Sequence, residues 1–392
     1  MTDDWEPDES DRPRTDESVL DDPRALEARD PGGMLRAVAS AGAQIREGVL
    51  RLDEDAVGAV VAEGRPRALI VTGMGGSGIA GDVVAGVTGL ACPIPVVVSR
   101  GYRLPGWVGP MDLVVAVSAS GETAETLAAT DEAIRRGARV ATVGRAGSAL
   151  AQRSAGGHAV HLPVETGGRM PRASLWALTT PALALVDGLG LARVPHGLLE
   201  SVADQLDAMS AACGPASDTY DNVAKRLALQ LSGTLPHIWG ASALATVAAL
   251  RFTCQLAENA KQPSVHGGLT EVHHNQVVAL AGRYGIGAGD AADDIFRDAL
   301  LDGGPAQERM RLLLLRDTEE LEAVARRCAA TGPLAEAYGV AVDELAATGE
   351  HPLERLASLI APLDFASVYL ALLEGTDPTP IEPIVTLKKA GS

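Results

Sequence analysis

The stretch LIVTGMGGSGIAGD at residues 69–82 decides the fold that we predict for this chain. The apolar run Ala68–Thr72 predicts a buried strand, and the small residues after the glycines are compatible with a helix. Between them, the glycines of Gly73–Gly78 let the backbone approach an anion closely, and the first N–H groups of the helix would point at it. The stretch by itself indicates either a phosphate-binding corner or a plain tight turn.

Two nucleotide-binding motifs do not fit this glycine-rich turn. No Lys-Ser or Lys-Thr pair follows the glycines, as a Walker loop requires. Gly73, Gly75 and Gly78 have the spacing of a dinucleotide fingerprint, but no acidic residue ends a second strand at the expected distance. We therefore predict that the protein uses no cofactor.

The charge of the chain limits its partners. The 392 residues are enough for two domains, and the formal net charge of −18 argues against a nucleic-acid partner, which would need a basic face. Met1–Asp30 contains twelve acidic and four basic residues and almost no large apolar ones. We predict that residues 1–30 form a disordered acidic tail.

Cysteine spacing and hydropathy indicate the compartment. The cysteines are far apart and show no Cys-x-x-Cys spacing, so neither a disulfide framework nor a zinc knuckle is expected. The chain does not start with a signal-peptide pattern, and no uninterrupted apolar run approaches the ~20 residues that span a bilayer. We predict a soluble cytoplasmic protein with no membrane partner.

Strands alternate with helices after the tail, which is typical of a parallel sheet covered by helices on both faces. We predict an N-terminal domain over residues 31–192, followed by a helical connector over residues 193–231. The expected strands of this domain are Ala68–Thr72, Ile94–Ser99, Leu113–Ser118, Ala138–Val143 and Ala159–Leu162.

Residues 232–392 are predicted to form a second α/β domain. The strand Leu235–Trp239, the Gly-Ala-Ser turn after it and a helix of small residues faintly repeat the first glycine corner. Gln276–Ala281 and Arg311–Arg316 are predicted as further strands, and Val340–Leu345 is compatible with a strand or a helix. The glycine-rich segments around residues 282–307 are predicted as loops.

A second candidate for phosphate binding is SASGETAET at Ser118–Thr126. Ligands of open α/β sheets bind at the carboxyl ends of the strands, and hydroxyls together with free N–H groups can hold a phosphate without a lysine. The alternative is a simple helix cap by Ser120 or Thr123, which is compatible with phosphate binding. Two such corners on one edge of the sheet favour the functional interpretation.

These corners resemble a sugar isomerase (SIS) domain, the module that binds phosphosugars. Together with four later segments, they resemble the bifunctional phosphoglucose/phosphomannose isomerases, in the family's order from about Leu69 to Lys389. The resemblance implies two doubly wound, flavodoxin-like domains and a sugar-phosphate isomerase activity. The later segments are GGRMPRA at Gly167–Ala173, ENAK at Glu258–Lys261, HHN at His273–Asn275 and DPTPIEPIVTLKK at Asp377–Lys389.

The resemblance assigns the phosphate of the substrate to the two corners. It implies that Gly76 and Ser77 meet the phosphate from the first corner, and that Ser118, Ser120 and Thr123 hold it from the second. The chain departs from the family pattern at the second corner, where Glu122 replaces an asparagine and Ala119 an aromatic residue. We expect Glu122 to point away from the phosphate.

The resemblance also assigns the catalytic roles. It implies that Glu258 is the base that moves a proton between C1 and C2, and that Arg172 stabilises the negative charge that develops. His274 would help to open the sugar ring, and Lys388 would help in this step or hold a ring oxygen. In the wider isomerase family the histidine comes from the other subunit, so the resemblance implies a homodimer.

General chemistry is consistent with these roles. Aldose–ketose isomerisation needs a base, for which a partly buried carboxylate is suited, a group that exchanges protons near neutral pH, and positive charge beside the enediolate. It needs no metal, and no ligand spacing stands out in the chain. The alternatives are a solvated Glu258 paired with Lys261, loop histidines, a solvated tail at Lys388 and an Arg172 that caps its loop.

We therefore expect an isomerase that interconverts fructose 6-phosphate with glucose 6-phosphate, mannose 6-phosphate or both through a cis-enediol(ate). Two other functions remain open from the sequence. One is a catalytically silent regulatory protein that binds phosphosugars, and the other is an isomerase for another sugar phosphate.

Overall fold

A computed structural model of the chain describes residues 16–155, 159–282, 284–285 and 309–390. The N-terminal domain contains a five-stranded sheet in the order β2-β1-β3-β4-β5, in which all neighbouring strands are parallel. This is the strand order of flavodoxin-like folds, so the predicted fold class is confirmed. The strands are β1 (Leu69–Thr72), β2 (Val96–Ser99), β3 (Leu113–Ser118), β4 (Arg139–Gly144) and β5 (Ala159–Pro163).

Alternate residues of these strands face two helical layers. Val71 and Val115 point into a core shared with helices α5 and α8, whereas Ile70 and Val114 belong to a cluster with Ala129 of helix α6. Both faces are therefore covered, as the continuous apolar strands predicted. The helices on these faces include α4 (Glu54–Ala62), α5 (Gly75–Thr88), α6 (Ala124–Arg135), α7 (Ala149–Ser154) and α8 (Leu175–Gly188).

The C-terminal domain repeats this topology with one strand fewer. Its parallel sheet has the order β7-β6-β8-β9, with strands β6 (Thr234–Gly240), β7 (Val265–Gly268), β8 (Arg309–Arg316) and β9 (Ala341–Ala346). Helices α12 (Leu269–Val272) and α13 (Glu322–Ala337) pack on its outer face, around Trp239 and Leu312. Helices α11 (Ala243–Gln255) and α14 (Pro352–Leu373) belong to the core on its other face.

One predicted strand of this domain is wrong. Gln276–Ala281 forms a 3-10 helix, η5, in which Leu280 is buried while Val278 and Ala279 are exposed. The apolar run was too short to distinguish a strand from a helical turn. Strand β7 occupies the place beside β6 instead, and the ambiguous segment near residue 340 is a strand, β9.

The N-terminal segment also differs from the prediction. Residues 1–15 lie outside the described part, but Glu17–Asp21 form a 3-10 turn (η2) and Pro23–Arg29 form helix α1. Leu20 and Leu26 are 0% and 1% exposed and join the main core. The predicted disordered tail is thus wrong for this part, because a few apolar residues suffice to anchor a short, otherwise acidic segment.

The remaining helices wrap the molecule. Helix α9 packs against α3 and α14, and α10 packs against α14, in the segment predicted as a helical connector. Helix α14 is long and apolar enough to span a bilayer, but its residues are buried inside the protein, so it is a core helix. These helices are α2 (Met34–Ala39), α3 (Ala41–Leu50), α9 (His196–Cys213) and α10 (Val223–Leu231).

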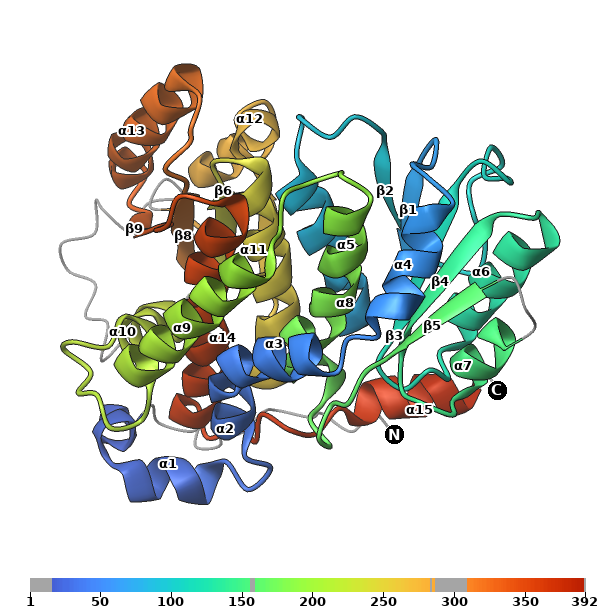
Figure 1. Ribbon diagram of the computed structural model, residues 1–392. Helices are drawn as coiled ribbons and strands as arrows, with labels where there is room; N and C mark the ends of the chain where they lie inside the picture. The colour runs from blue at the N-terminus through green and yellow to red at the C-terminus, as the bar shows by residue number, and fades with distance from the viewer. Residues whose placement is uncertain (1–15, 156–158, 283, 286–308, 391–392) are drawn as a thin grey trace, which may run out of the picture.

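The two domains share one hydrophobic core. Figure 1 shows the sheets on the two sides of a layer of helices, in which α5 and α11 pack against each other. A side chain at Gly86 of α5 would meet Leu244 at the start of α11 at 3.1 Å, so the end of α5 lies against the beginning of α11. The first turn of α5 and the last turn of α11 consequently lie at the same end of the interface.

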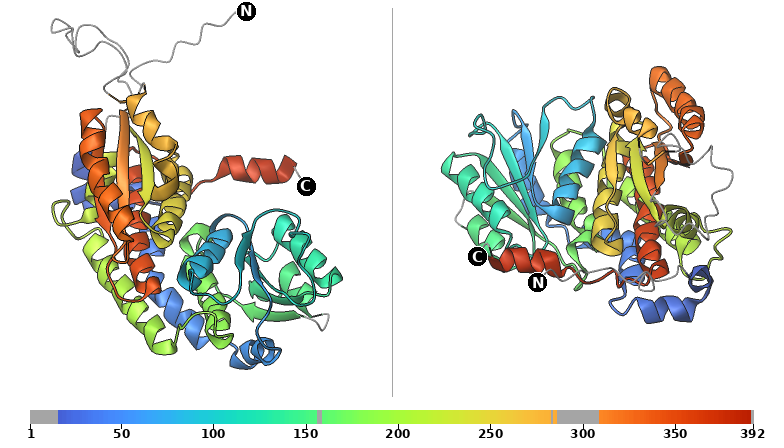
Figure 2. Two further views of the ribbon diagram at one scale, coloured as in Figure 1. Left: turned by 90° about the horizontal axis from the view of Figure 1, so that it is seen from above. Right: turned by 180° about the vertical axis from the view of Figure 1, so that it is seen from behind.

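The last helix, α15 (Glu382–Ala390), departs from this compact arrangement. All of its residues are exposed, and Figure 2 shows it as an arm that leaves the C-terminal domain. The arm carries the exposed apolar residues Ile384, Val385 and Leu387.

Candidate active site

The glycine turn after β1 is packed against the segment that carries Arg172. Helix α5 begins at Gly75, whose φ of 53° lies in the left-handed region that favours glycine. A side chain at Gly76 would meet the carbonyl oxygen of Pro171 at 2.8 Å and the Cα atom of Arg172 at 3.0 Å. Gly76 therefore lets the first corner and residues 171–172 approach each other.

The two predicted phosphate corners lie together. Ser77 is buried, and its Oγ atom accepts a hydrogen bond of 3.1 Å from the N–H group of Ala119 in the second corner. A hydroxyl that accepts in this way can still donate its proton to a ligand. Because β1 and β3 are parallel neighbours, both corners leave the same edge of the sheet, as predicted.

Hydroxyl groups also shape the second corner. Ser118 Oγ accepts from Gly121 N at 3.1 Å and lies 3.0 Å from Thr123 Oγ1. The exposed Ser120 accepts a hydrogen bond from Glu122 N at 3.2 Å. Thr123 stands at the N-cap of α6, but its side chain makes no capping hydrogen bond, so its hydroxyl is not used as a simple cap.

Glu122 points away from this corner, as expected. Its Oε1 atom accepts a hydrogen bond of 3.0 Å from Ala149 N at the start of α7, and it lies 3.4 Å from an Nη atom of Arg145. The carboxylate is therefore held at the beginning of another helix.

The side chain of Arg172 is held by two other segments of the chain. Its side chain is 2% exposed, its Nε atom donates to Asn259 Oδ1 at 2.7 Å, and its Nη2 atom donates to the carbonyl oxygens of Pro378 and Thr379 at 2.8 and 3.0 Å. Its Nη1 atom lies 3.6 Å from Glu258 Oε2. The predicted cation and the predicted base are thus neighbours.

Burial and the charge of Glu258 act in opposite directions on the pKa of Arg172. Burial lowers the pKa of the Arg172 guanidinium, and the Glu258 carboxylate opposes this shift. Two of the donors that could reach Glu258 are committed elsewhere, so the remaining Nη1 atom faces the carboxylate. The arrangement places one positive and one negative group side by side at the domain interface.

Glu258 lies in an unusual turn. Helix α11 gives way to a π-helical turn at Leu256–Ala260 (η4), which ends at Lys261 with a φ of 58°. The Nζ atom of Lys261 donates to the carbonyl oxygens of Glu258, Asn259 and Pro380 at 2.7, 3.3 and 2.9 Å. Lys261 therefore fixes the backbone of the turn and does not pair with the Glu258 carboxylate, whose side chain is 24% exposed.

The sequence did not predict a buried hydrogen-bond network that lies behind Arg172. Arg251 donates to Asp364 at 2.9 and 2.6 Å and to the carbonyl oxygen of Arg172 at 2.9 Å, while Gln255 donates to Asp364 at 3.1 Å. Residues that are 113 positions apart in the chain give no local signal of such a pair. The contact of Asn259 with Arg172 did have a local signal, because Asn259 directly follows Glu258 in the ENAK motif.

The structure does not bring His274 or Lys388 to this site within one chain. His274 is exposed and follows α12, near the edge of the sheet where α11 begins, whereas Glu258 lies beyond the other end of α11. The helical path from Ser242 to Glu258 is roughly 24 Å long at 1.5 Å per residue. Lys388 is exposed on the arm α15. The neighbouring His273 is a packing residue that contacts Thr331 at 3.0 Å and the Trp239 ring.

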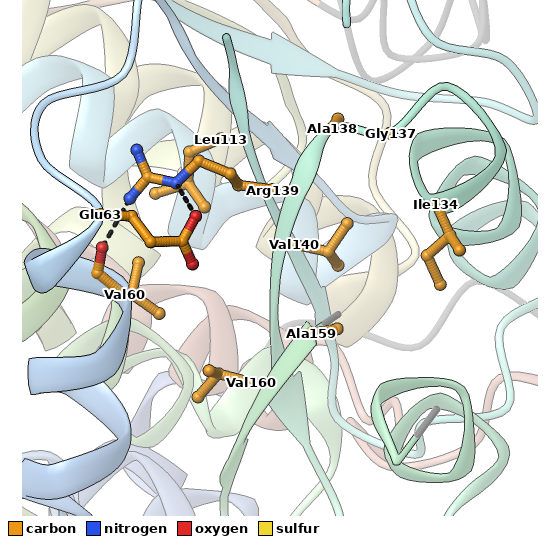
Figure 3. A pocket seen from close by; sticks show the side chains of 10 residues that line it. All are labelled: Val60, Glu63, Leu113, Ile134, Gly137, Ala138, Arg139, Val140, Ala159 and Val160. Atoms are coloured by element: carbon orange, nitrogen blue, oxygen red, sulfur yellow. Dashed lines mark hydrogen bonds and ion pairs between the residues drawn. The ribbon is translucent and has the colours of Figure 1, made fainter. Parts of the chain in front are cut away.

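A cavity of about 640 Å³ lies at the opposite edge of the N-terminal sheet, where β3, β4 and β5 begin (Figure 3). Its walls are apolar apart from Arg139 and Glu63, which form an ion pair of 3.0 Å. Arg139 also donates to the carbonyl oxygens of Val60 and Gly64. Its position at the amino ends of the strands separates this cavity from the two corners.

Comparison with known proteins identifies relatives of the chain. Residues 220–390 match the family described as the bacterial phospho-glucose isomerase C-terminal SIS domain. A bifunctional phosphoglucose/phosphomannose isomerase of Caldicellulosiruptor bescii is 32% identical over 323 residues, which cover 82% of this chain and 88% of that protein. A protein of the same name from Thermoplasma acidophilum is 27% identical over 327 residues, with shares of 82% and 88%.

Solved structures show the same fold at low identity. A glucose-6-phosphate isomerase from Chlamydia trachomatis aligns with a TM-score of 0.69 at 12% identity, over 96% of this chain and 84% of that chain. The C-terminal domain of a glucosamine-fructose-6-phosphate aminotransferase from Francisella tularensis aligns with a TM-score of 0.65 at 15% identity, over 88% of this chain and 98% of that chain. The similarity to the C. bescii protein, at 32% identity over 88% of its length, shows that the chain belongs to the bifunctional phosphoglucose/phosphomannose isomerase family.

Proposed function

We propose that the protein interconverts fructose 6-phosphate with glucose 6-phosphate, mannose 6-phosphate or both. The observation that carries this proposal is the meeting of Gly76, Arg172 and Glu258, which joins a corner suited to phosphate to an acid–base group and a cation. The names of the relatives from C. bescii and T. acidophilum support the same reaction.

The phosphate of the substrate binds at the two corners. The donors are the N–H groups at the start of α5 and the hydroxyls of Ser77, Ser118, Ser120 and Thr123. The Glu122 carboxylate does not repel the phosphate, because it is hydrogen-bonded to Ala149 N at the start of α7. No lysine is needed, because hydroxyl and amide donors can hold the oxyanion.

Glu258 then moves the proton. The carboxylate takes a proton from the carbon beside the carbonyl group, and the carbonyl oxygen becomes the enediolate oxygen. The proton of the neighbouring hydroxyl group passes to that oxygen, and Glu258 returns its proton to the former carbonyl carbon, so that the carbonyl group has moved by one carbon. Arg172 stabilises this developing charge, since its Nη1 atom lies beside the carboxylate in a water-poor environment. Glucose and mannose 6-phosphates give the same enediolate, so a single base can serve both.

The ring-opening groups come from beyond this site. We infer that His274 is supplied by a second copy of the chain in a homodimer, because His274 and Glu258 lie beyond opposite ends of α11. Lys388 reaches the sugar when the arm α15, which follows the Arg172-bound segment Pro378–Thr379, folds over the site.

A coupled assay tests the activity. Fructose 6-phosphate should be converted to glucose or mannose 6-phosphate, and a small panel of other sugar phosphates should be turned over more slowly. Binding of fructose 6-phosphate without conversion would contradict the proposal and identify a phosphosugar-binding regulatory protein instead. Turnover of another sugar phosphate alone would show a different aldose–ketose isomerase.

Mixed dimers test the shared site. Glu258→Gln and His274→Gln chains should each be inactive, and after unfolding and refolding together in equal amounts they should regain about one quarter of the wild-type activity. Half of the randomly formed dimers are then mixed, and each has one site with both residues intact. A matched mixture of Glu258→Gln and Arg172→Met chains should stay inactive, because these residues belong to the same chain's site.

A further inference from the structure

Three residues of helix α11 and the turn after it contact Arg172. Arg251, Gln255 and Asn259 follow one another at intervals of four residues, the spacing of neighbours on one helix face, and we call them the Arg172 ladder. Nη2 of Arg251 donates to the carbonyl oxygen of Arg172 at 2.9 Å, and Nε2 of Gln255 lies 3.5 Å from the same oxygen. Asn259 accepts from Nε of Arg172 at 2.7 Å, so the ladder holds both the backbone and the side chain of this residue.

Helix α14 supports every member of the ladder. Asp364 accepts from Nε and Nη2 of Arg251 at 2.9 and 2.6 Å and from Gln255 at 3.1 Å, while Ser367 accepts from Asn259 at 2.9 Å. All five residues are buried. Apolar residues that replace a buried ion pair often give equal or greater stability, because they avoid the cost of desolvating two charges. Stability alone is therefore a weak explanation for the pair of Arg251 and Asp364.

The first phosphate corner contacts the same residue from the N-terminal domain. Arg172 lies in the 3-10 helix η3 (Pro171–Ala173), and a side chain at Gly76 would meet its Cα atom at 3.0 Å. Its carbonyl oxygen, however, is held by helix α11 of the C-terminal domain. The place of the Arg172 guanidinium, whose Nη1 atom lies 3.6 Å from Glu258 Oε2, therefore depends on a hydrogen bond between the domains.

We propose that Arg251, held by Asp364, is a positioning residue that fixes the guanidinium of Arg172 beside Glu258. This role rests on the isomerase activity proposed above, in which Arg172 stabilises the enediolate. Arg251 acts through Arg172, because its side chain is 4% exposed and its Nε and Nη2 atoms are bound to Asp364 and to the Arg172 carbonyl. Turnover is sensitive to such placement, since a displacement of about 1 Å can lower a rate on the order of 100-fold.

The double variant Arg251→Met/Asp364→Leu tests this role by removing both buried charges together. It leaves no unpaired charge, so it should fold with a thermal unfolding midpoint near that of the wild type. Its kcat for fructose 6-phosphate should fall at least about tenfold, because Arg172 loses its support. KM should change less than about twofold, because the hydroxyl groups of the phosphate corners are untouched.

A milder variant keeps the test informative if the double variant does not fold. Gln255→Met removes the longer contact with the Arg172 carbonyl and leaves the bidentate pair of Arg251 and Asp364 in place. Its kcat should fall by a smaller factor, again without a matching change in KM. A wild-type kcat in a folded Gln255→Met and in a folded double variant would overturn the proposal.

Arg67 and Asp112 provide a matched control. Nε and Nη2 of Arg67 donate to Asp112 at 2.9 and 2.6 Å, and Nη2 also donates to the carbonyl oxygen of Trp107 at 2.7 Å, so the pattern of hydrogen bonds is that of Arg251. The pair lies where β1 and β3 begin, at the opposite edge of the sheet from the corners. Arg67→Met/Asp112→Leu should keep the wild-type kcat. An equal loss of kcat in both double variants would show a general structural effect and overturn the proposal.

Crystal structures of the two double variants test the position of Arg172 without any turnover. In Arg251→Met/Asp364→Leu, the backbone of residues 171–173 should move away from α11, and the distance between Arg172 and Glu258 should increase. The control should keep both groups in place. An unmoved Arg172 would overturn the positioning role. A wild-type protein without isomerase activity would contradict the proposed function instead, and the crystal structures would still show whether Arg251 positions Arg172.

Discussion

The Nε atom of Arg172 donates a hydrogen bond of 2.7 Å to Asn259 Oδ1, so the residue next to Glu258 orients the cation that faces Glu258. Asn259 is itself held by Ser367, to which it donates at 2.9 Å. Base and cation are therefore positioned by one turn of the chain, η4.

Asn259→Ala should lower kcat by about 10- to 100-fold. The change leaves a buried donor of Arg172 unsatisfied, which costs about 1–3 kcal/mol, and it releases the guanidinium from its orientation. Steady-state kinetics would measure the loss, and Gln152→Ala, at an exposed position of α7, serves as the control. A wild-type kcat in Asn259→Ala would show that Arg172 needs no such support.

Glu258→Gln should lower turnover by several orders of magnitude without unfolding the protein. The amide has nearly the same shape but cannot accept the proton that moves between the carbons. Exchange of the substrate hydrogen with deuterated water, followed by NMR, would report the step directly. Glu336→Gln, at an exposed position of α13, should exchange normally. Normal isomerisation by Glu258→Gln would exclude this residue as the base.

Ser120→Ala should raise KM for fructose 6-phosphate about tenfold and change kcat little. Ser120 is exposed and accepts only from the neighbouring Glu122 N among the described residues, so its loss should leave the loop intact. A hydrogen bond to a charged phosphate contributes about 1.5–3 kcal/mol. Ser18→Ala, an exposed serine near the N-terminus, is the control. An unchanged KM would place the phosphate elsewhere.

Asp364→Ala should lower the free energy of unfolding by about 3–5 kcal/mol, because it leaves the buried cation of Arg251 unpaired. Burial raises the pKa of Asp364, and the charge of Arg251 opposes this effect. Chemical denaturation measures the change. The control Asp204→Ala removes an exposed partner of Arg46 and should cost less than about 1 kcal/mol. Equal effects of the two substitutions would contradict the assigned role of the buried pair.

The stability that His237 contributes should fall as the solution becomes acidic. Burial lowers the pKa of His237 below its usual 6.5, so the unfolded chain binds a proton first on acidification. The difference in unfolding free energy between wild type and His237→Gln should therefore shrink below pH 6.5, by at most about 1.4 kcal/mol per pH unit.

Urea denaturation between pH 7.5 and 5.5 would measure this difference. The exposed His196→Gln is the control and should follow the wild type across the range. A gap between wild type and His237→Gln that stays constant with pH would show that this imidazole does not titrate differently in the folded state.

Local patterns predicted most of the fold. Continuous apolar runs followed by glycine or serine turns located β1, β3 and both corners, because each signal lies within a few residues. The disordered tail was predicted from composition, whereas Leu20 and Leu26 anchor part of it by contacts with distant helices. Gln276–Ala281 has the apolar content of a strand but is covered on one side only.

The site was predicted less completely, for a physical reason. Arg172 and Glu258 were predicted from their motifs, and the structure places them 3.6 Å apart. The network of Arg251 and Asp364 depends on how α11 meets α14, which no local pattern encodes. The site of His274 and Lys388 remains a prediction, because it depends on a second copy and on the position of the arm.

Because a single helical layer lies between the two sheets, the chain cannot be cut into two halves that each fold alone. Since α5 and α11 belong to a single core, a gene fragment that encodes either half alone would expose an apolar face as wide as the interface, and the fragment should aggregate. Neither half can therefore be lost or exchanged as an independent module.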